Sequence, residues 1–420
     1  MTALLITAAV VALALAGVPV FALIAGGALL AFHQAGIDSS AVIVEMLRLA
    51  GMPSLIAIPL FTFAGFVLAE SGTPVRMLNL GKALFGSLRP GLAVAALLAT
   101  ALFTAFTGAS GVTIIALGGL LYPMLREQGY SEKFSLGLLT TTGSLGLLFP
   151  PSLPIILYGL VAGVSIDKLF AAGLLPGILL IAVLAVYAAW QGRKSGVQPV
   201  PFSWDELKKA AREAAWEIPL PFLVIGGIYG GWFTASEAAT VMAAYVLLVE
   251  SLVYREINIF RDVPRIVASS MMLVGAIFLV LGTALGLTNY LVDAEIPSRI
   301  FAWLHTYVSS KTLFLIVLNV FLLVVNMIEI FSAIIIVVPI ITPVAAQYGI
   351  DPIHLGIIFL LNLEIGYMTP PLGLNLFLSS RRFNAPLPKL YAAVLPFWLM
   401  LLASLAIVTY VPSLSLWRHL

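Results

Sequence analysis

Two double prolines interrupt long apolar stretches, and they mark the positions where this sequence could do chemistry. Pro150-Pro151 lies in GSLGLLFPPSLPIILYG and Pro370-Pro371 lies in EIGYMTPPLGLNLF. Adjacent prolines remove two backbone donors and push the preceding residue out of the helical region, so a helix must unwind there. Within a membrane, unwound backbone is tolerated where it lines a cavity, and its free carbonyls suit Na⁺. We therefore expect a cation to bind near each pair.

The polar residues around these breaks predict two sodium sites of similar build. Each break follows an apolar stretch with a polar or small centre, Thr107-Gly108-Ala109-Ser110 in one case and Glu329-Ile330-Phe331-Ser332 in the other. The first sodium site is predicted to use Thr107, Gly108, Ser110, Ser144, Gly146 and Pro150. The second is predicted to use Glu329, Ser332, Gly366, Thr369 and Pro371.

Six further polar residues near the breaks are candidates for contact with a substrate: Thr141, Thr142, Ser152, Asn326, Asn362 and Asn375. A structural role is an open alternative for all of them. The hydroxyls can bond back to their own helices, and the amides can join neighbouring helices. No Lys or Arg lies in these stretches, so an anionic substrate would be held by helix N-termini, amides and co-bound cations.

Glu329 and Glu364 are acidic residues within apolar segments. A charge there costs at least about 2.5–3.5 kcal/mol, so such residues face a polar interior. Each is either a cation ligand or a neutral carboxyl that bonds to a neighbour.

Other kinds of chemistry are excluded by what the sequence lacks. It contains no cysteine, no H-E-x-x-H and no G-x-x-x-x-G-K-[ST], and its 4 histidines are scattered. We therefore expect no cofactor and no metal other than Na⁺. Without an ATP site, any energy that the protein needs would come from an ion gradient or the membrane potential. The net charge of +2 gives no reason to expect nucleic-acid binding.

The composition predicts that helices in a lipid bilayer position these residues. Hydrophobic residues make up 61% of the 420 and charged residues only 10%, whereas soluble domains carry roughly 25% charged residues. No charged residue occurs between Arg89 and Arg126, a stretch longer than the ~20 residues that cross a bilayer. The fold class predicted is an all-α polytopic membrane protein, because lipid leaves backbone groups no partners outside a helix.

Charged and turn-rich stretches divide the chain into apolar segments near 3–31, 51–69, 91–125, 134–165, 169–190, 218–233, 236–253, 266–290, 312–346, 355–380 and 390–413. The segments 91–125 and 312–346 exceed one crossing and have polar centres, so each is predicted to be a helical hairpin. Residues 3–31 form either one span kinked near Gly17-Val18-Pro19 or two short ones.

The basic residues predict the orientation. With the hairpins counted as returns, 16 of the 21 Lys and Arg residues fall on one face, which is the mark of the cytoplasmic side. The C-terminus is then expected on the opposite, outer side of the membrane. The linker 191–217, with SWDELKKAAREAAWE, is predicted to be an amphipathic helix on the cytoplasmic surface, with Ser203 as its N-cap.

The chain repeats itself with an offset of 220 residues, which brings Pro150 onto Pro370 and Gly146 onto Gly366. An odd number of predicted crossings separates the halves, so the repeats are inverted. Paired broken helices in inverted repeats point to a transporter's site at the bilayer midplane. The predicted domains are 1–190 (scaffold 3–31, interfacial arm 40–50, hairpin 91–125, broken helix 134–165), the linker 191–217, and 218–420 (scaffold 218–253, arm 254–265, hairpin 312–346, broken helix 355–380).

The chain resembles one known family along essentially its whole length, and four stretches carry the resemblance. They are IPLFTFAGFVLAESG (58–72), GLAVAALLATALFTAFTGASG (91–111), LGLLFPPSLPIILYG (145–159) and IDPIHLGIIFLLNLEIGYMTPPLGLNLF (350–377). The chain resembles the large membrane subunit of TRAP transporters, the tripartite ATP-independent periplasmic family. Its first hairpin centre reads TGASGVTII, without the Asp that many members carry nearby.

The resemblance implies Na⁺-driven uptake of small organic acids by an elevator-type fold in a bacterial or archaeal inner membrane, with the C-terminus in the periplasm. It also implies two protein partners: a periplasmic substrate-binding protein and a small four-helix membrane subunit. Thr107–Gly111, Ser144–Ser152, Glu329–Ser332 and Gly366–Asn375 would line the sodium and substrate sites. The alternatives are a stand-alone Na⁺/dicarboxylate symporter of similar architecture, a channel, and an intramembrane enzyme using Glu329 and Glu364 as an acid pair.

Overall fold

The computed structural model describes residues 12–13, 16–38, 40–87, 91–197, 201–325 and 330–417. All regular structure in these ranges is helical. Six of the described helices are long and apolar enough to cross a membrane, and a seventh crossing is added if α8 and α9, which meet at a 45° bend, are counted as one span. The predicted fold class, an all-α multi-pass membrane protein, is confirmed.

The first half of the chain runs through a hairpin and a broken helix. Its elements are α2 (Val20–Gln34), α3 (Ser40–Ala50), η1 (Pro53–Ile56), α4 (Ala57–Glu70), α5 (Thr73–Phe85), α6 (Gly91–Thr107), α7 (Ser110–Glu127), α8 (Glu132–Thr142), η2 (Leu145–Leu148), α9 (Leu153–Ala162) and α10 (Ile166–Lys194). The linker helix α11 (Trp204–Glu213) follows, and the Ser203 hydroxyl accepts the Glu206 N–H at 3.3 Å, which confirms the predicted N-cap.

The second half repeats this order. Its elements are α12 (Pro219–Tyr229), α13 (Ala235–Leu248), the π-turn η3 (Val249–Val253), α14 (Asp262–Asp293), α15 (Ile296–His305), α16 (Lys311–Val325), α17 (Ile330–Gln347), α18 (Pro352–Gly366), α19 (Leu374–Phe383), α20 (Leu387–Tyr410) and α21 (Ser413–Leu416). Helices α5 to α10 thus correspond to α15 to α20, with 220 residues between the two double prolines.

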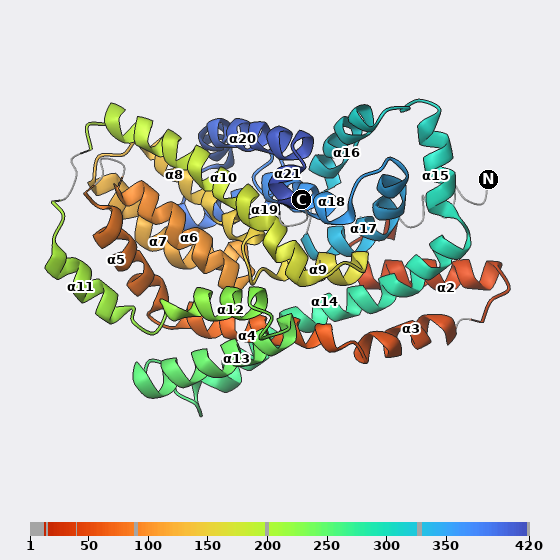
Figure 1. Cartoon of the computed structure of the whole chain (residues 1–420), viewed down its shortest axis with the longest axis horizontal. Helices are drawn as coiled ribbons and strands as arrows, with labels where there is room; N and C mark the ends of the chain where they lie inside the picture. The colour runs from red at the N-terminus through yellow and green to blue at the C-terminus, as the bar shows by residue number, and fades with distance from the viewer. Residues whose placement is uncertain are drawn as a thin grey trace.

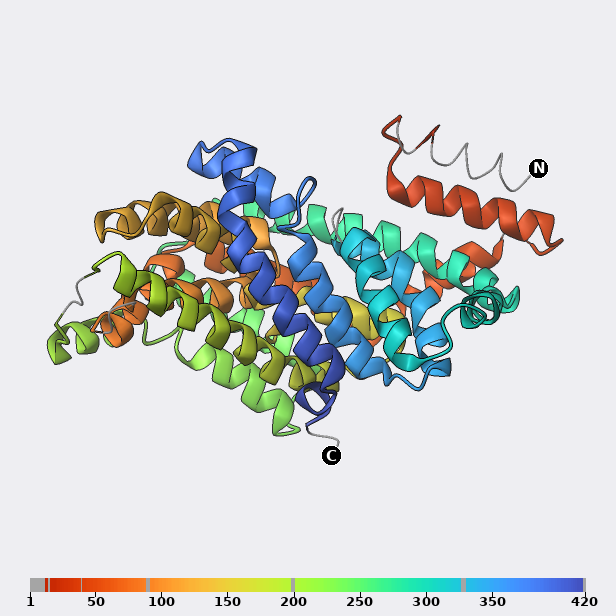
Figure 2. The same ribbon diagram turned by 90° about the horizontal axis from the view of Figure 1, so that it is seen from above.

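Helices of each repeat pack against helices of the other repeat. Helices α6 and α7 lie on one side of the centre of the molecule and α16 and α17 on the other (Figure 1). The second helix of each hairpin packs against the second half-helix of the other repeat, α7 on α19 and α17 on α9. Helix α20 crosses the middle diagonally in Figure 2. The breaks of both repeats therefore share one core.

Helix α18 lies at the centre of that core. Every residue from Ile353 to Gly366 is buried, which explains why this helix is apolar on all sides. It starts sharply because the Asp351 carboxylate accepts the N–H groups of Ile353 and His354 at 2.7 and 3.3 Å.

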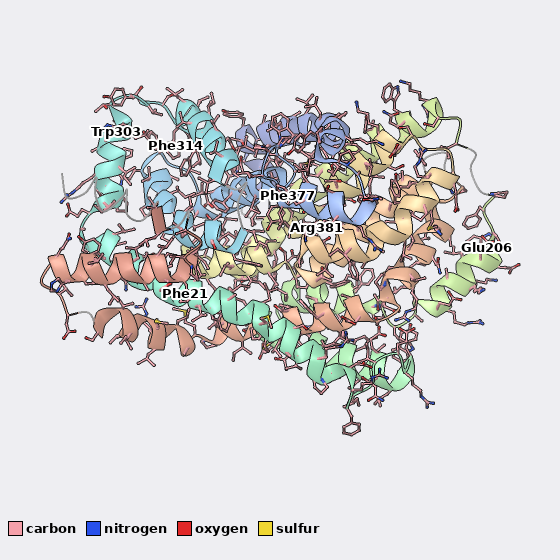
Figure 3. The ribbon with its side chains drawn as sticks, turned by 180° about the vertical axis from the view of Figure 1, so that it is seen from behind. Phe21, Glu206, Trp303, Phe314, Phe377 and Arg381 are labelled. Carbon is pink, nitrogen blue, oxygen red and sulfur yellow. The ribbon has the colours of Figure 1, made fainter. Side chains whose placement is uncertain are left out.

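A separate group of helices packs around α14. Helices α2, α3 and α4 all contact it, and α13 lies along α4. The predicted arm 40–50 falls on α3. The linker helix α11 and the helix α15 lie at opposite ends of the molecule, as Glu206 and Trp303 show in Figure 3.

Two segments differ from the sequence expectation, and a third agrees with it. The segment 218–233 forms only the 11-residue α12, about 16 Å long, because Gly230 and Gly231 end it. In the predicted arm 254–265 the first eight residues are not helical, since the Asn258 side chain accepts the N–H groups of Phe260 and Arg261 in a turn. In 3–31, a turn at Gly17 with φ of 83° lies at the position of the predicted kink, and α2 begins after it at Val20; residues 3–11, 14 and 15 lie outside the described residues.

Candidate functional site

The tip of the first hairpin closes over the first break. Thr107 ends α6 and Ser110 starts α7, so the connection has only two residues, and Gly108 adopts a φ of +64°. A Cβ on Gly108 would lie 2.6 Å from the Leu153 side chain, at the start of α9. The tip can approach the break this closely because a glycine occupies this position.

Hydroxyl groups fix the hairpin to the break. The hydroxyls of Thr104 and Thr113 pair across the hairpin at 2.7 Å, and Thr104 also bonds to the Gly143 carbonyl at 2.9 Å. Gly146 is pressed against α6, since a Cβ there would collide with the backbone of Ala101 and Ala105. Hairpin and break therefore form one rigid unit.

The second repeat contributes residues to this same site. The Asn375 amide donates to the Thr140 carbonyl at 3.2 Å and to the Ser144 hydroxyl at 3.4 Å. The Thr140 hydroxyl donates to that of Ser379 at 2.9 Å, and Thr141 bonds to the Met368 sulfur at 3.6 Å. Of the predicted residues, the structure thus brings together Thr107, Gly108, Ser110, Thr141, Thr142, Ser144, Gly146, Pro150, Ser152 and Asn375.

Several oxygens of this site are buried without a hydrogen-bond partner among the described residues. They are Thr107 Oγ1, Thr142 Oγ1, Ser152 Oγ and Asn375 Oδ1. A buried polar atom left unpaired costs about 1–3 kcal/mol, and most native ones find a partner. Neutral oxygens of hydroxyls, amides and free carbonyls are ligands for a hard cation such as Na⁺. The described residues contain no His, Cys, Asp and Glu grouping that could hold another metal.

Three helix N-termini meet at the site. Helices α7, α9 and α19 begin at Ser110, Leu153 and Leu374. The start of α9 touches the hairpin tip, and Asn375, the second residue of α19, donates to the Ser144 hydroxyl at 3.4 Å. Helix N-termini carry partial positive charge and free N–H groups, so they favour an anion. The arrangement can thus hold a cation and a carboxylate without any Lys or Arg.

The second break is built differently. The Thr369 hydroxyl donates to the Ile365 carbonyl at 2.8 Å and accepts from Trp398 Nε1 at 2.9 Å. Pro371 is exposed, and its carbonyl accepts from the Tyr391 hydroxyl at 3.2 Å. Gly366 is buried at the end of α18, and Ser332 lies in the first turn of α17. The predicted site residues Glu329 and Asn326 lie outside the described residues.

Asn362 points away from the first break. Its amide donates to the Asn319 side chain at 2.6 Å and to the Ile358 carbonyl at 2.8 Å, and Asn319 in turn bonds to Thr409 at 3.3 Å. Asn362 therefore joins α18 to α16 and, through Asn319, to α20. Glu364 is fully buried on α18, and neither carboxyl oxygen has a hydrogen-bond partner among the described residues.

One polar network was not anticipated from the sequence. Arg76 on α5 contacts Glu217, Glu250 at 2.9 Å and Glu256 at 2.7 Å, and its guanidinium lies 3.8 Å from the centre of the Tyr254 ring. Glu250 interrupts an apolar run, which was a usable signal, but its partner is 174 residues away. The network fixes the start of α5 to the end of the linker and to η3.

Comparisons with known proteins agree with this architecture. Residues 4–414 match the family described as "Tripartite ATP-independent periplasmic transporter, DctM component". The C4-dicarboxylate TRAP transporter large permease protein DctM of Pseudomonas aeruginosa is 38% identical, over 86% of this chain and 85% of that protein. The isethionate TRAP transporter permease protein DctMQ of Oleidesulfovibrio alaskensis is 36% identical over 86% of this chain, which matches 57% of that longer protein.

Among solved structures, the YdaH transporter of Alcanivorax borkumensis, described as having an unusual topology, superposes with a TM-score of 0.62. The match covers 90% of this chain and 88% of that one at 15% identity. At this identity the likeness concerns the fold alone.

Proposed function

The chain belongs to the DctM family, the large permease component of tripartite ATP-independent periplasmic transporters, and we propose that it imports small organic acids, C4-dicarboxylates among them, together with Na⁺. Members of this family are transporters, so the alternative of an intramembrane enzyme is set aside. The substrate class is proposed from the relatives, one named for C4-dicarboxylates and one for isethionate.

The observation that carries the proposal is the set of unpartnered oxygens around the first break. Thr107, Thr142, Ser152 and Asn375 place four such atoms in a buried region where two repeats meet. One Na⁺ bound there satisfies them and adds positive charge to three helix N-termini, so it raises the affinity for a carboxylate. Coupling then follows, because cation and anion each improve the binding of the other.

For the movement, we propose that the hairpins and broken helices travel as one block. The exchange of α7 and α17 between repeats makes this block continuous, whereas α2, α3, α4, α13 and α14 pack mainly on one another. The second group would be the scaffold of an elevator. The Arg76 network ties α5, which leads into the first hairpin, to that scaffold.

We further propose two protein partners, a periplasmic substrate-binding protein and a small four-helix membrane subunit. The longer isethionate relative, named DctMQ, supports a second membrane component, since this chain matches only 57% of it. The C-terminus is proposed to be periplasmic.

Uptake by proteoliposomes tests the proposal. The purified chain, the small subunit and a binding protein loaded with radiolabelled succinate or isethionate should accumulate substrate only with an inward Na⁺ gradient. Omitting either partner should abolish uptake. Full uptake by the chain alone would instead identify a stand-alone symporter, and uptake that persists when K⁺ replaces Na⁺ would contradict sodium coupling.

A further inference from the structure

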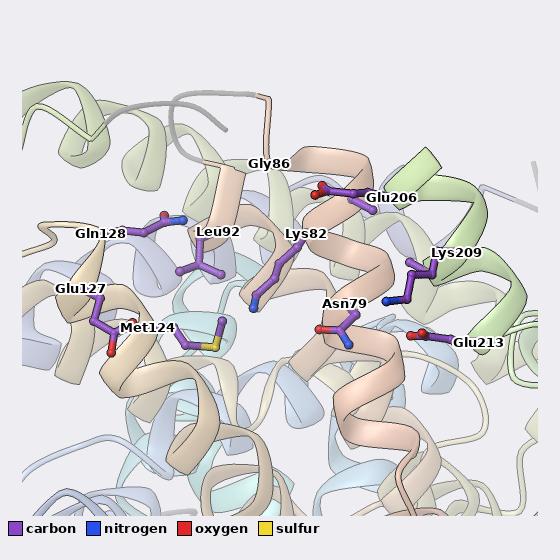
Figure 4. Close-up of a pocket in the computed structure, with 12 residues that line it drawn as sticks. Asn79, Lys82, Gly86, Leu92, Met124, Glu127, Gln128, Glu206, Lys209 and Glu213 are labelled. Atoms are coloured by element: carbon purple, nitrogen blue, oxygen red, sulfur yellow. The ribbon is translucent and has the colours of Figure 1, made fainter. Parts of the chain in front are cut away.

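A cleft separates the linker helix from the base of the first hairpin. It has a volume of about 480 Å³ and lies between the end of α5, the start of α6, the end of α7 and α11 (Figure 4). None of the candidate sodium or substrate residues lines it. Its volume falls within the range of about 300–1,000 Å³ of small-molecule sites.

Charges of both signs face this cleft. Lys82 and Lys209 line it together with Glu127, Glu206 and Glu213, as Figure 4 shows. None of these five side chains forms an ion pair with any of the residues that the structure describes. Since none of the five is ion-paired to a described residue, both cationic and anionic binding positions are open among the described walls of the cleft.

Lys82 is the most enclosed of the five. Its side chain is half-buried, and burial lowers the pKa of its ammonium, an effect that the charge of Glu127 opposes. A charged group taken out of water is stabilised by a counter-ion. A simple anion at Lys82 would be repelled by three carboxylates, and a simple cation would be repelled by two ammonium groups. A molecule that carries both charges meets neither difficulty.

The remaining walls are apolar or amide-bearing. Leu92 and Met124 provide an apolar strip beside Lys82, and Asn79 and Gln128 provide neutral donors and acceptors. The cleft lies at the end of the molecule that carries α11, which the distribution of basic residues predicts to be cytoplasmic, where the headgroups of the inner leaflet lie.

We propose that this cleft binds a zwitterionic phosphoethanolamine group, the headgroup of phosphatidylethanolamine. Its phosphate contacts Lys82 and Lys209, its primary ammonium donates to the carboxylates, and its acyl chains leave along Leu92 and Met124. A primary ammonium donates three charge-assisted hydrogen bonds, whereas the quaternary ammonium of phosphatidylcholine donates none. The lipid would join the linker helix to the base of the hairpin. The binding does not depend on the substrate or coupling ion proposed above.

Lipid retention measured by native mass spectrometry tests the site. The full chain is released from nanodiscs that contain equal amounts of phosphatidylethanolamine, phosphatidylcholine and phosphatidylglycerol. We expect selective retention of phosphatidylethanolamine, and about a tenfold loss of that retention in Lys82→Gln and in Glu213→Gln, since each removes one charged partner. Lys168→Gln, the same change at an exposed lysine outside the cleft, should retain the lipid as the wild type does.

Two further arms make the result decisive. Glycerophosphoethanolamine, the same headgroup without acyl chains, displaces the lipid if the natural occupant is soluble, and fails to displace it if the occupant is the lipid. If Lys82→Gln does not fold, Glu206→Gln on the exposed face of α11 replaces it. Equal retention of the three lipids by the wild type, or unchanged selectivity in the cleft variants, would overturn the proposal.

Discussion

The two breaks share their prolines but differ in their surroundings. Both contain a cis Pro–Pro bond, 220 residues apart, between a helix that ends early and a short second half-helix. Pro150 and Pro151 are buried beneath the first hairpin, whereas Pro370 and Pro371 are exposed and Leu372 is 56% exposed. The prolines thus determine where each helix unwinds, and the neighbouring elements determine what the unwound segment can bind.

The hydroxyl groups of the two breaks also differ in whether they have hydrogen-bond partners. In the first break the hydroxyls of Thr142 and Ser152 have no partner among the described residues, while in the second the Thr369 hydroxyl both donates and accepts a hydrogen bond. An unpartnered group is available to a ligand, and a satisfied one stabilises the protein. The two breaks have similar backbones, but the hydroxyls around the first are open to a ligand, whereas around the second the unpartnered oxygens are those of Asn362 and Glu364 on α18.

The largest effect is expected from adding one methyl group in the first break. In Gly146→Ala the new Cβ collides with the backbone of Ala101 and Ala105, which cannot rotate away as a side chain can. We expect a loss of more than about 3 kcal/mol of stability and no uptake. Gly275→Ala is the matched control, because nothing lies within 4 Å of its Cβ position. Thermal unfolding in detergent checks both, and equal unfolding temperatures would contradict the close packing of the break.

Exchanging Thr for Val at each break should give opposite results. Thr107→Val removes an unpartnered hydroxyl, so stability should stay level or rise, while the Na⁺ concentration for half-maximal uptake rises at least about tenfold. Thr369→Val removes two hydrogen bonds and leaves Trp398 Nε1 unpaired, so about 1–3 kcal/mol of stability is lost.

Unfolding temperature and the sodium dependence of uptake, measured on both variants, test this crossover. If one variant showed the larger loss in both unfolding temperature and sodium dependence, the two breaks would not differ in function as their hydrogen bonds indicate.

Asn375 allows the coupling between the repeats to be measured. It donates to Ser144 across 231 residues of sequence. In a double-mutant cycle of Ser144→Ala and Asn375→Ala, we expect an interaction energy of about 0.5–1 kcal/mol in stability. Strictly additive effects would mean that the Asn375–Ser144 hydrogen bond contributes no interaction energy between the two breaks.

The smallest effect is expected at Glu364. No group among the described residues bonds to its carboxyl, so the amide of Glu364→Gln has the same shape and breaks no contact. We expect an unfolding temperature within about 2 °C of the wild type, because the replacement keeps the side-chain volume and removes no hydrogen bond to a described residue. A large loss of stability would reveal a partner, for example a bound cation.

The positions of the breaks and hairpins follow directly from the sequence. Adjacent prolines and polar centres in charge-free stretches act locally, so 91–125 and 134–165 correspond closely to α6–α7 and α8–α9. The helix in 218–233 is shorter than the apolar segment because hydropathy does not register that Gly230 and Gly231 stop α12 after 11 residues.

Hydrogen-bond and ion-pair partners from distant parts of the chain could not be predicted from the sequence. Asn362 and Asn375 have the same side chain and flank the same break, yet one faces Asn319 on α16 and the other faces Thr140 on α8. Which way each points depends on the turn of α18 and on the path of the unwound segment. The Arg76 network was missed for the same reason, since its members come from three separate regions.

The exchange of α7 and α17 between repeats has a consequence for how the chain is made. The first site needs Asn375 and Ser379, which a ribosome adds more than 220 residues after Thr140 and Ser144. Until α19 has been synthesised, Thr140 and Ser144 lack these two hydrogen-bond partners. A chain that stops before α19 would therefore contain the first double proline but not the α19 side chains that bond to Thr140 and Ser144.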